Sequence, residues 1–223
     1  MPPKRPTPKP TPPEQNELGL ERIVFFSDAV MAIAITLLAI DLKVPEISPS
    51  QAAAELPAQF SALTPRIMSF VISFAVVGIY WTAHHRYFRY IKRYDGGLIA
   101  LNLLFLLFIV VMPFVAGILG QYAYLPVGVI PYSAAVAAIG FVISALWFYA
   151  SHNHRLVDAS LDDHFIRTRT IISLVIPLVF LVSIPFAFLS PVAAIVVWWA
   201  SPLISGVTQR LSERWQAPKK RGR

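Results

Sequence analysis

The stretch from Arg22 to Asp41, RIVFFSDAVMAIAITLLAID, decides the fold of this chain because it is long and apolar enough to cross a bilayer. About 20 helical residues, rising ~1.5 Å each, span a hydrocarbon layer ~30 Å thick. The pair Ser27-Asp28 stands out in this stretch, because an aspartate in hydrocarbon costs roughly 2.5–3.5 kcal/mol on insertion scales. Its carboxylate therefore needs hydrogen-bond donors or a cation from a neighbouring helix.

The rest of the chain repeats this apolar pattern. Of the 223 residues, 56% are hydrophobic and 14% are charged, whereas soluble domains carry about 25% charged residues. The fold class expected is an all-α membrane protein with six transmembrane helices per subunit. The predicted spans are residues 20–43, 64–91, 97–121, 128–151, 168–189 and 191–211.

The segments outside the spans differ in composition. Residues 1–19 are proline-rich and basic and predict a disordered tail, and residues 212–223 predict a basic cytoplasmic tail. Residues 51–60, within the one sizeable loop, predict a short surface helix. The chain has no cysteine, which excludes disulfides, thiolate metal sites and cysteine nucleophiles.

Basic residues are distributed unevenly between the two ends of the spans. An even number of spans places both termini on one side, and that side receives all but Lys43 and Arg66 of the 19 lysines and arginines. The positive-inside rule makes it the cytoplasmic side of a cell (inner) membrane protein. The net charge of +7 is then explained by topology and by attraction to anionic lipid, and no nucleic-acid partner is expected.

One face of the first span carries a continuous stripe of side chains. On a helical wheel the stripe residues fall within about 60° of one line, with Ser27 and Asp28 off to its two sides. The stripe could line a pore or pack in a bundle core, and the pattern alone favours the core. Its members are Arg22, Phe26, Ala29, Ile33, Thr36, Leu37 and Ile40.

Donors for Asp28 are available on the second span, in YWTAHHRYF at residues 80–88. Trp81 and His84 share a helix face, and Trp81 and His85 nearly do. Because the second span runs antiparallel to the first, these side chains lie at the depth of Asp28. Further candidates to bond the carboxylate are Arg22 and Arg86, and Asn102 in the third span is expected to hydrogen-bond across helices.

These residues carry a family resemblance. The pattern Arg22-x-x-x-Phe26-Ser27-Asp28, continued by AVMAIAITLLAIDLKVP, resembles the motif that opens the first helix of the transmembrane protein 175 family of potassium channels. The group Trp81, His84 and His85 is similar to the histidine-bearing stretch of that family's second helix. The resemblance covers about the first 95 residues through motifs and the remainder through the number of spans.

The resemblance implies a prokaryotic, single-repeat channel domain at residues 20–211 that forms a homotetramer, with the pore lined by the first helix of each subunit. It implies passive, potassium-selective or potassium-preferring conduction without a cofactor, with potassium ions and the lipid bilayer as further partners. The carried-over constriction is Ile33, Leu37 and Ile40, with Thr36 as a polar ring beside them. The residues expected to brace the pore helix are Arg22, Phe26, Ser27, Asp28, Trp81, His84 and His85.

The sequence leaves one alternative to the channel. A proton-coupled secondary transporter, or a proton pathway through Asp28 and His84, remains the alternative. An enzyme is not expected, because the consecutive residues Ser27 and Asp28 diverge on a helix and form no ready relay with His84.

Two groups of histidines are candidate metal sites by residue type. His84 and His85 diverge by about 100° on a helix, which suits chelation poorly. The linker histidines are more simply explained as solvated polar residues at the membrane surface than as a loose metal or proton site. They are His152, His154 and His164.

Overall fold

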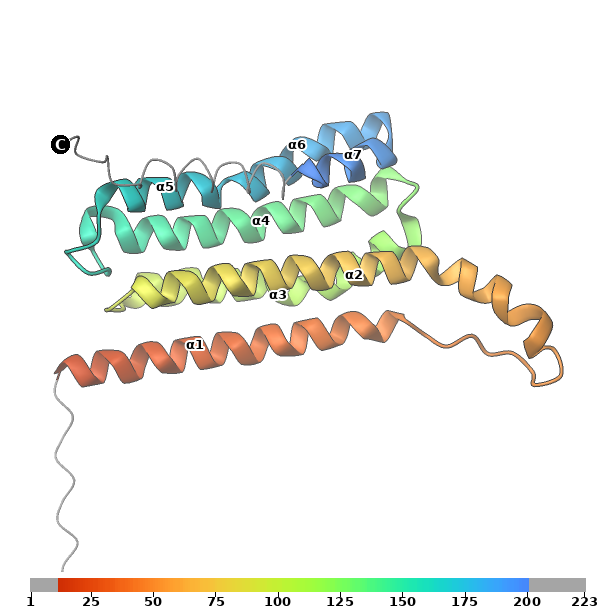
Figure 1. The fold of residues 1–223 in the computed structure, drawn as a ribbon, viewed down its shortest axis with the longest axis horizontal. Coiled ribbons are helices and arrows are strands. Elements are labelled where there is room, and N and C mark those ends of the chain that lie inside the picture. The colour runs from red at the N-terminus through yellow and green to blue at the C-terminus, as the bar shows by residue number, and fades with distance from the viewer. Residues whose placement is uncertain (1–11, 201–223) are drawn as a thin grey trace, which may run out of the picture.

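The computed structural model describes residues 12–200, and within that range the fold is all-α. Figure 1 shows the helices lying side by side along one long axis. In chain order they are α1 (Pro12–Leu37), the 3₁₀ turn η1 (Leu38–Asp41), α2 (Ala52–Tyr90), α3 (Gly96–Tyr122), α4 (Pro126–Ser151), the 3₁₀ turn η2 (His152–His154), α5 (Asp163–Ser173), α6 (Val175–Leu189) and α7 (Pro191–Trp198).

Five helical stretches in the described range are long and apolar enough to cross a membrane, so the chain is a multi-pass membrane protein. They correspond to the first five predicted spans, and the fifth consists of α5 and α6 together, interrupted at Leu174. The predicted sixth span, residues 191–211, begins with α7, and its remainder lies outside the described residues, as does the predicted tail at 212–223.

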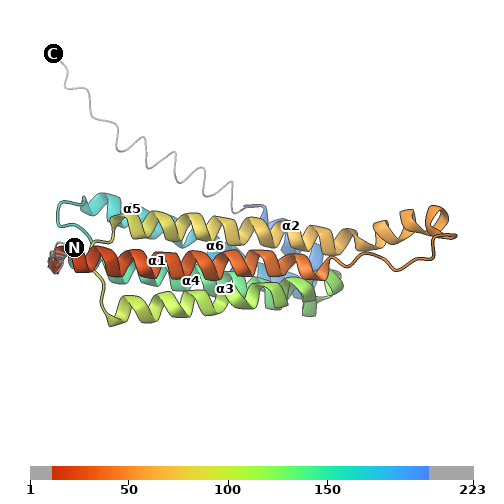
Figure 2. The ribbon, with the colours of Figure 1, turned by 90° about the horizontal axis from the view of Figure 1, so that it is seen from below.

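The helices form two groups, one on each side of α4. Figure 1 shows α4 between the α1–α3 group and the α5–α7 group, and α4 packs most extensively against α3 and α6. Its side chains Tyr132, Ile139 and Trp147 are fully buried in the core. Figure 2 shows α1 running alongside α2 and α3, and among the described elements the first helix contacts only these two helices and η1.

The amino-terminal prediction was wrong for residues 12–19, which are helical rather than disordered. Proline suits the first turn of a helix, because its missing N–H would have no intrahelical partner there, and its fixed φ already matches the helix. Gly19 then permits close packing, since a Cβ at this position would collide with the ring of Tyr94. The first turns of α1 thus contact the turn that precedes α3.

The predicted surface helix at residues 51–60 is instead continuous with the second span, as the first part of α2. Pro57 and Pro65 lie inside this helix, and a proline bends a helix without necessarily ending it. Figure 1 shows the beginning of α2 curving away from the bundle and extending beyond the ends of the other helices.

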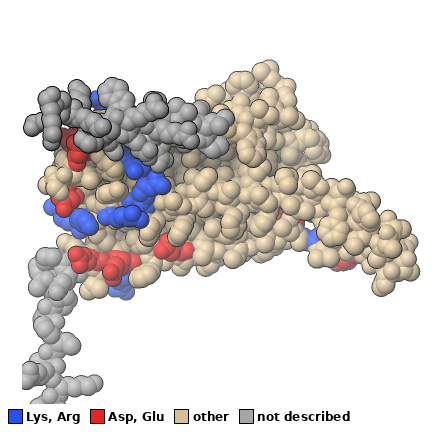
Figure 3. Space-filling model, viewed as in Figure 1, with Lys and Arg blue, Asp and Glu red and all other residues tan. Residues whose placement is uncertain are grey.

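Figure 3 shows that most charged side chains gather toward the end of the bundle where α1 and α5 begin, whereas most of the remaining face is uncharged. At this end Asp95 caps α3 by accepting from the Leu98 N–H at 2.9 Å. The same carboxylate accepts from the Tyr149 hydroxyl at 2.9 Å and from Arg155 at 3.0 Å. The Leu98 N–H, then Tyr149 and Arg155, lower the pKa of Asp95.

The histidine linker lies at the same end. His154 Nε2 is 2.9 Å from the carbonyl oxygen of Leu161 and 3.7 Å from a carboxylate oxygen of Asp163. Among the described residues, no three histidine or acidic side chains are grouped so that they could hold a metal ion. The linker contacts are those of a polar turn at the end of the bundle.

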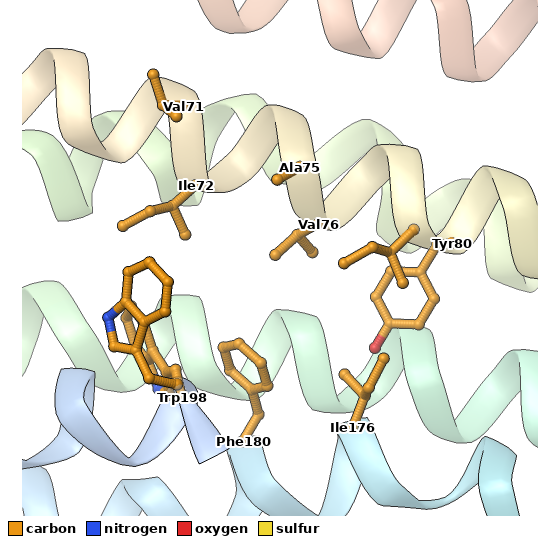
Figure 4. Close-up of a pocket in the computed structure, with 10 residues that line it drawn as sticks. Val71, Ile72, Ala75, Val76, Tyr80, Ile176, Phe180 and Trp198 are labelled. Carbon is orange, nitrogen blue, oxygen red and sulfur yellow. The ribbon is translucent and has the colours of Figure 1, made fainter. Parts of the chain in front are cut away.

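An apolar cavity of about 200 Å³ lies between α2, α6 and α7 (Figure 4). Val76 and Tyr80 of α2 face Phe180 of α6 and Trp198 of α7 across it. The Tyr80 hydroxyl donates to the carbonyl of Val136 in α4 at 2.9 Å. The polar end of this side chain therefore finds its hydrogen-bond partner in α4 and not in the cavity.

Candidate functional site

The stripe on α1 is exposed in the single chain. All seven of its side chains are exposed, and the exposed fractions of Ile33, Leu37 and Ile40 are 59%, 40% and 64%. The stripe therefore does not pack in the core of this chain, contrary to the interpretation that the pattern alone favoured. It presents an apolar surface along the length of a membrane-spanning helix.

The opposite face of α1 is buried. Ser27, Met31, Ala34 and Leu38 have exposed fractions of 4% or less, and their spacing of four, three and four residues follows one side of a helix. This face packs against α3 and α2. The first helix thus has one face fixed by its own chain and one face left open.

Asp28 receives a hydrogen bond from the second span. The indole Nε1–H of Trp81 in α2 donates to Oδ1 of Asp28 at 2.8 Å. An indole N–H can only donate and a carboxylate accepts readily, so the pair is chemically matched. His85 stacks on Trp81 with ring centroids 5.9 Å apart and is itself exposed.

Ser27 belongs to a separate, buried chain of hydrogen bonds. His84 Nε2 in α2 lies 2.9 Å from Asn102 Oδ1 in α3, and Asn102 Nδ2 donates to Ser27 Oγ at 2.9 Å. The Ser27 hydroxyl in turn donates to the carbonyl of Ile23, one turn earlier in α1, at 2.8 Å. Three helices are therefore joined through one asparagine.

The direction of each hydrogen bond in this series follows from the bond that the Ser27 hydroxyl donates. Because Ser27 gives its proton to Ile23, its oxygen must accept from Asn102, which turns the asparagine Oδ1 toward His84. The histidine Nε2 must then carry the proton, so His84 is the neutral Nε2–H tautomer. Its Nδ1 is a buried atom without a hydrogen-bond partner in the described range.

Aromatic rings surround His84. Its ring stacks on Phe88 with centroids 4.3 Å apart and on Phe105 with centroids 5.5 Å apart, and the side chain is fully buried. A proton added at Nδ1 would meet no acceptor in this apolar enclosure. The arrangement suits a fixed structural donor better than a group that gains and loses protons.

The structure brings together only some of the residues predicted to brace the helix. Ser27, Asp28, Trp81 and His84 are bonded across helices, but His84 reaches Ser27 through Asn102 and does not bond Asp28. Within the described part of the chain, no ion pair joins Arg22 to Asp28. Phe26 lies on the exposed stripe.

Asn102 was expected to bond across helices but was not assigned to this network. The available signal was a single amide in the otherwise apolar segment LIALNLLFLLF, because such a group needs a partner in a membrane. The sequence could not show which side chains it would meet, since that depends on how α3 packs against α1 and α2.

Comparison with known proteins relates this geometry to a family. The family model described as the endosomal/lysosomal potassium channel TMEM175 matches residues 22–113, a segment that contains the whole network. A potassium channel of Streptomyces collinus is 37% identical over 152 residues, covering 66% of this chain and 71% of that protein. A potassium channel of Chamaesiphon minutus is 34% identical over 181 residues, covering 80% of this chain and 88% of that protein.

A solved structure has the same fold. The crystal structure described as a lysosomal potassium-selective channel TMEM175 homolog from Chamaesiphon minutus superimposes with a TM-score of 0.72 at 27% identity. The match covers 87% of this chain and 98% of that one. On the matched segment, the relatives and the fold, the chain belongs to the TMEM175 family of potassium channels.

Proposed function

We propose that this protein is a passive, potassium-selective cation channel of the cell (inner) membrane, with both termini in the cytoplasm, formed by four copies of the chain. The relatives named as potassium channels support the ion. The observation that carries the proposal is the exposed apolar stripe on α1, opposite a face that is fixed by hydrogen bonds.

In the proposed assembly, the stripes of four copies face one another around a central axis. Ile33, Leu37 and Ile40 would form successive aliphatic rings, about 6 Å apart between the first two by helical rise. Thr36 would add hydroxyls beside them, although each donates its own proton to the carbonyl of Ile33 at 2.8 Å. Such rings select by pore radius and by the cost of removing water from the ion.

The bonds on the buried face would hold the rings in place. A helix in lipid has no strong apolar preference for one rotation, because acyl chains accept Ile and Leu on any side. The bonds of Ser27 to α3 and of Asp28 to α2 remove that freedom. We therefore assign these two residues to bracing rather than to ion binding.

The network also favours a passive channel over the proton pathway. Asp28 and His84 belong to separate hydrogen-bond branches, with Trp81 on one and Asn102 on the other. The hydrogen bonds of the His84 branch run in one direction, from His84 through Asn102 and Ser27 to the carbonyl of Ile23. A relay of protons would require each of these bonds to reverse.

The experiment is a flux measurement with single cysteines placed in this cysteine-free chain. Liposomes containing the protein are loaded with potassium and diluted into sodium, and a proton carrier with a pH dye reports potassium efflux. Ile40→Cys on the stripe is compared with Leu107→Cys, because Leu107 is an exposed side chain of α3 with an exposed fraction of 58%. A charged, water-soluble thiol reagent should block flux through Ile40→Cys and leave Leu107→Cys unchanged.

The result also separates a pore from a stripe that faces lipid. A thiol in hydrocarbon stays protonated and unreactive toward a polar reagent, because the thiolate is the nucleophile. Equal labelling and equal flux in both variants would contradict the pore assignment. Flux that appears only without the proton carrier would instead support proton-coupled transport.

A further inference from the structure

A polar cavity of about 220 Å³ lies at the end of the bundle opposite the charged end seen in Figure 3. Its walls come from η1 and the residues after it, from α2 near Arg66, and from the last turns of α3. Leu38 and Phe70 contribute apolar atoms to the wall, and Ser69 and Gln121 contribute polar atoms. The cavity thus borders η1, which carries Ile40 and follows directly after Leu37, the last residue of α1.

Two cations line this cavity without a partner. Within residues 12–200, neither the Lys43 ammonium nor the Arg66 guanidinium takes part in a side-chain hydrogen bond or an ion pair. Arg66 is only partly exposed, and its guanidinium has five N–H donors to satisfy. These are also the two basic residues that the positive-inside rule predicts to lie on the outer side of the membrane.

Glycines of α3 shape the floor of the cavity. A Cβ at Gly117 would collide with the carboxylate of Asp41, and one at Gly120 would lie 3.1 Å from the Cα of Arg66. The small residues therefore let η1 and α2 approach α3 while the charged groups stay around an open space. With one carboxylate and two cations, the cavity has a net positive charge.

We propose that this cavity binds a phosphate group at the outer surface of the membrane. A guanidinium matches phosphate oxygens with paired N–H donors, and an ammonium adds a point charge. The group could be carried by a phospholipid headgroup, whose apolar part would contact Leu38 and Phe70, or it could be free inorganic phosphate. Either source would satisfy Lys43 and Arg66 together.

Occupancy of the cavity would connect three elements. The bound group would join Lys43, just after η1, to Arg66 of α2 and to the end of α3. This would restrain the outer end of α1, and on the proposed function above it would therefore restrain the outermost aliphatic ring. Binding itself does not depend on conduction and can be tested without it.

The test measures how fast a membrane-impermeant amine-acylating reagent modifies Lys43, with Lys92 in the same molecule as the internal reference. Lys92 is exposed at the charged end, so a general effect of lipid charge alters both rates. The protein is placed in nanodiscs of phosphatidylglycerol, of a phosphate-free galactolipid, or of the galactolipid with added inorganic phosphate. Acylation at each lysine is quantified by peptide mass spectrometry.

In phosphatidylglycerol we expect the Lys43 rate, relative to Lys92, to fall about fivefold, which corresponds to a site occupied about four-fifths of the time. Protection restored by inorganic phosphate alone would identify the free ion as sufficient, and protection by phosphatidylglycerol alone would identify the lipid. Arg66→Gln should abolish protection, whereas Asp41→Asn should keep or strengthen it because it removes the competing carboxylate.

Equal relative rates in all three nanodiscs would overturn the proposal, as would full protection in Arg66→Gln. If Arg66→Gln fails to fold, the three lipid conditions with the unmodified chain and with Asp41→Asn still decide whether the cavity binds phosphate. A protein that shows protected Lys43 but no potassium flux would refute the channel while leaving this site intact. Potassium flux without protection of Lys43 would refute the phosphate site and leave the channel intact.

Discussion

Asn102→Leu tests whether one asparagine joins three helices. Leucine keeps the branch at Cγ and is larger than asparagine, so the substitution leaves no cavity, but it removes both hydrogen bonds of the amide. His84 Nε2–H then loses its acceptor, and the Ser27 oxygen loses its donor. Both groups are fully buried, so bulk solvent does not reach them to replace the lost partner.

The expected cost follows from two interhelical bonds. Such bonds in membrane proteins average about 0.6 kcal/mol and reach about 1.7 kcal/mol, so two predict a loss of roughly 1–3 kcal/mol. Part of the loss is the penalty for leaving buried polar groups unpaired. The affected property is the free energy of unfolding, measured by titrating the micelle-bound protein with a denaturing detergent.

A double-mutant cycle isolates the bond between Asn102 and Ser27. Ser27→Ala and Asn102→Leu together should cost less than the sum of the single changes, by about 0.6–1.7 kcal/mol. Thr82→Val is the matched control, because the Thr82 hydroxyl donates only to the Gly78 carbonyl of its own helix and should cost under about 0.5 kcal/mol. Additive single changes, or an Asn102→Leu protein as stable as the original, would refute the reasoning.

Three further predictions concern other contacts of the bundle. Trp81→Phe removes the N–H that reaches the carboxylate of α1 and should lower the free energy of unfolding by about 0.6–1.7 kcal/mol, measured by the same titration. The Asp95 pKa is lowered in the fold, so its carboxylate stabilises the protein above the unfolded-state pKa of about 3.9 and loses this effect as pH falls through the lowered value; the melting temperatures of the original protein and Asp95→Asn should therefore differ at neutral pH and converge in acid. Gly19→Ala should destabilise the protein, because its Cβ would collide with the ring of Tyr94. Gly78→Ala meets no atom within 4 Å and should be neutral or stabilising by up to about 1 kcal/mol. A lower melting temperature for Gly19→Ala alone would agree with the packing, and equal shifts in the two variants would contradict it.

Most of the fold could be predicted from the periodicity and length of the apolar segments. Apolar segments of about 20 residues leave few alternatives in a bilayer, and the described part of the chain has its five long apolar helices where the first five spans were predicted. The antiparallel order of the first two spans also predicted that Trp81 could reach the depth of Asp28, and the structure has this hydrogen bond. Both inferences need only local geometry.

Side-chain contacts that depend on the packing of a third helix could not be predicted from the sequence. His84 bonds Asn102 rather than Asp28 because α3 packs against both α1 and α2, and no periodicity encodes that arrangement. The helical start at Pro12 was missed because composition suggested disorder, while the close approach of Gly19 to Tyr94 depends on tertiary packing. A local sequence pattern predicts where helices form, but the hydrogen-bond partners of their side chains depend on how the helices pack.

The pair Ser27-Asp28 now has a physical reason to be consecutive. Adjacent helical residues point about 100° apart, so the two side chains reach different neighbours: Ser27 bonds α3 through Asn102, and Asp28 bonds α2 through Trp81. One bond would leave α1 free to turn about that contact, whereas two bonds in different directions fix its rotation. Because lipid imposes no rotation on an apolar helix, this two-point attachment determines which side chains α1 presents on its open face.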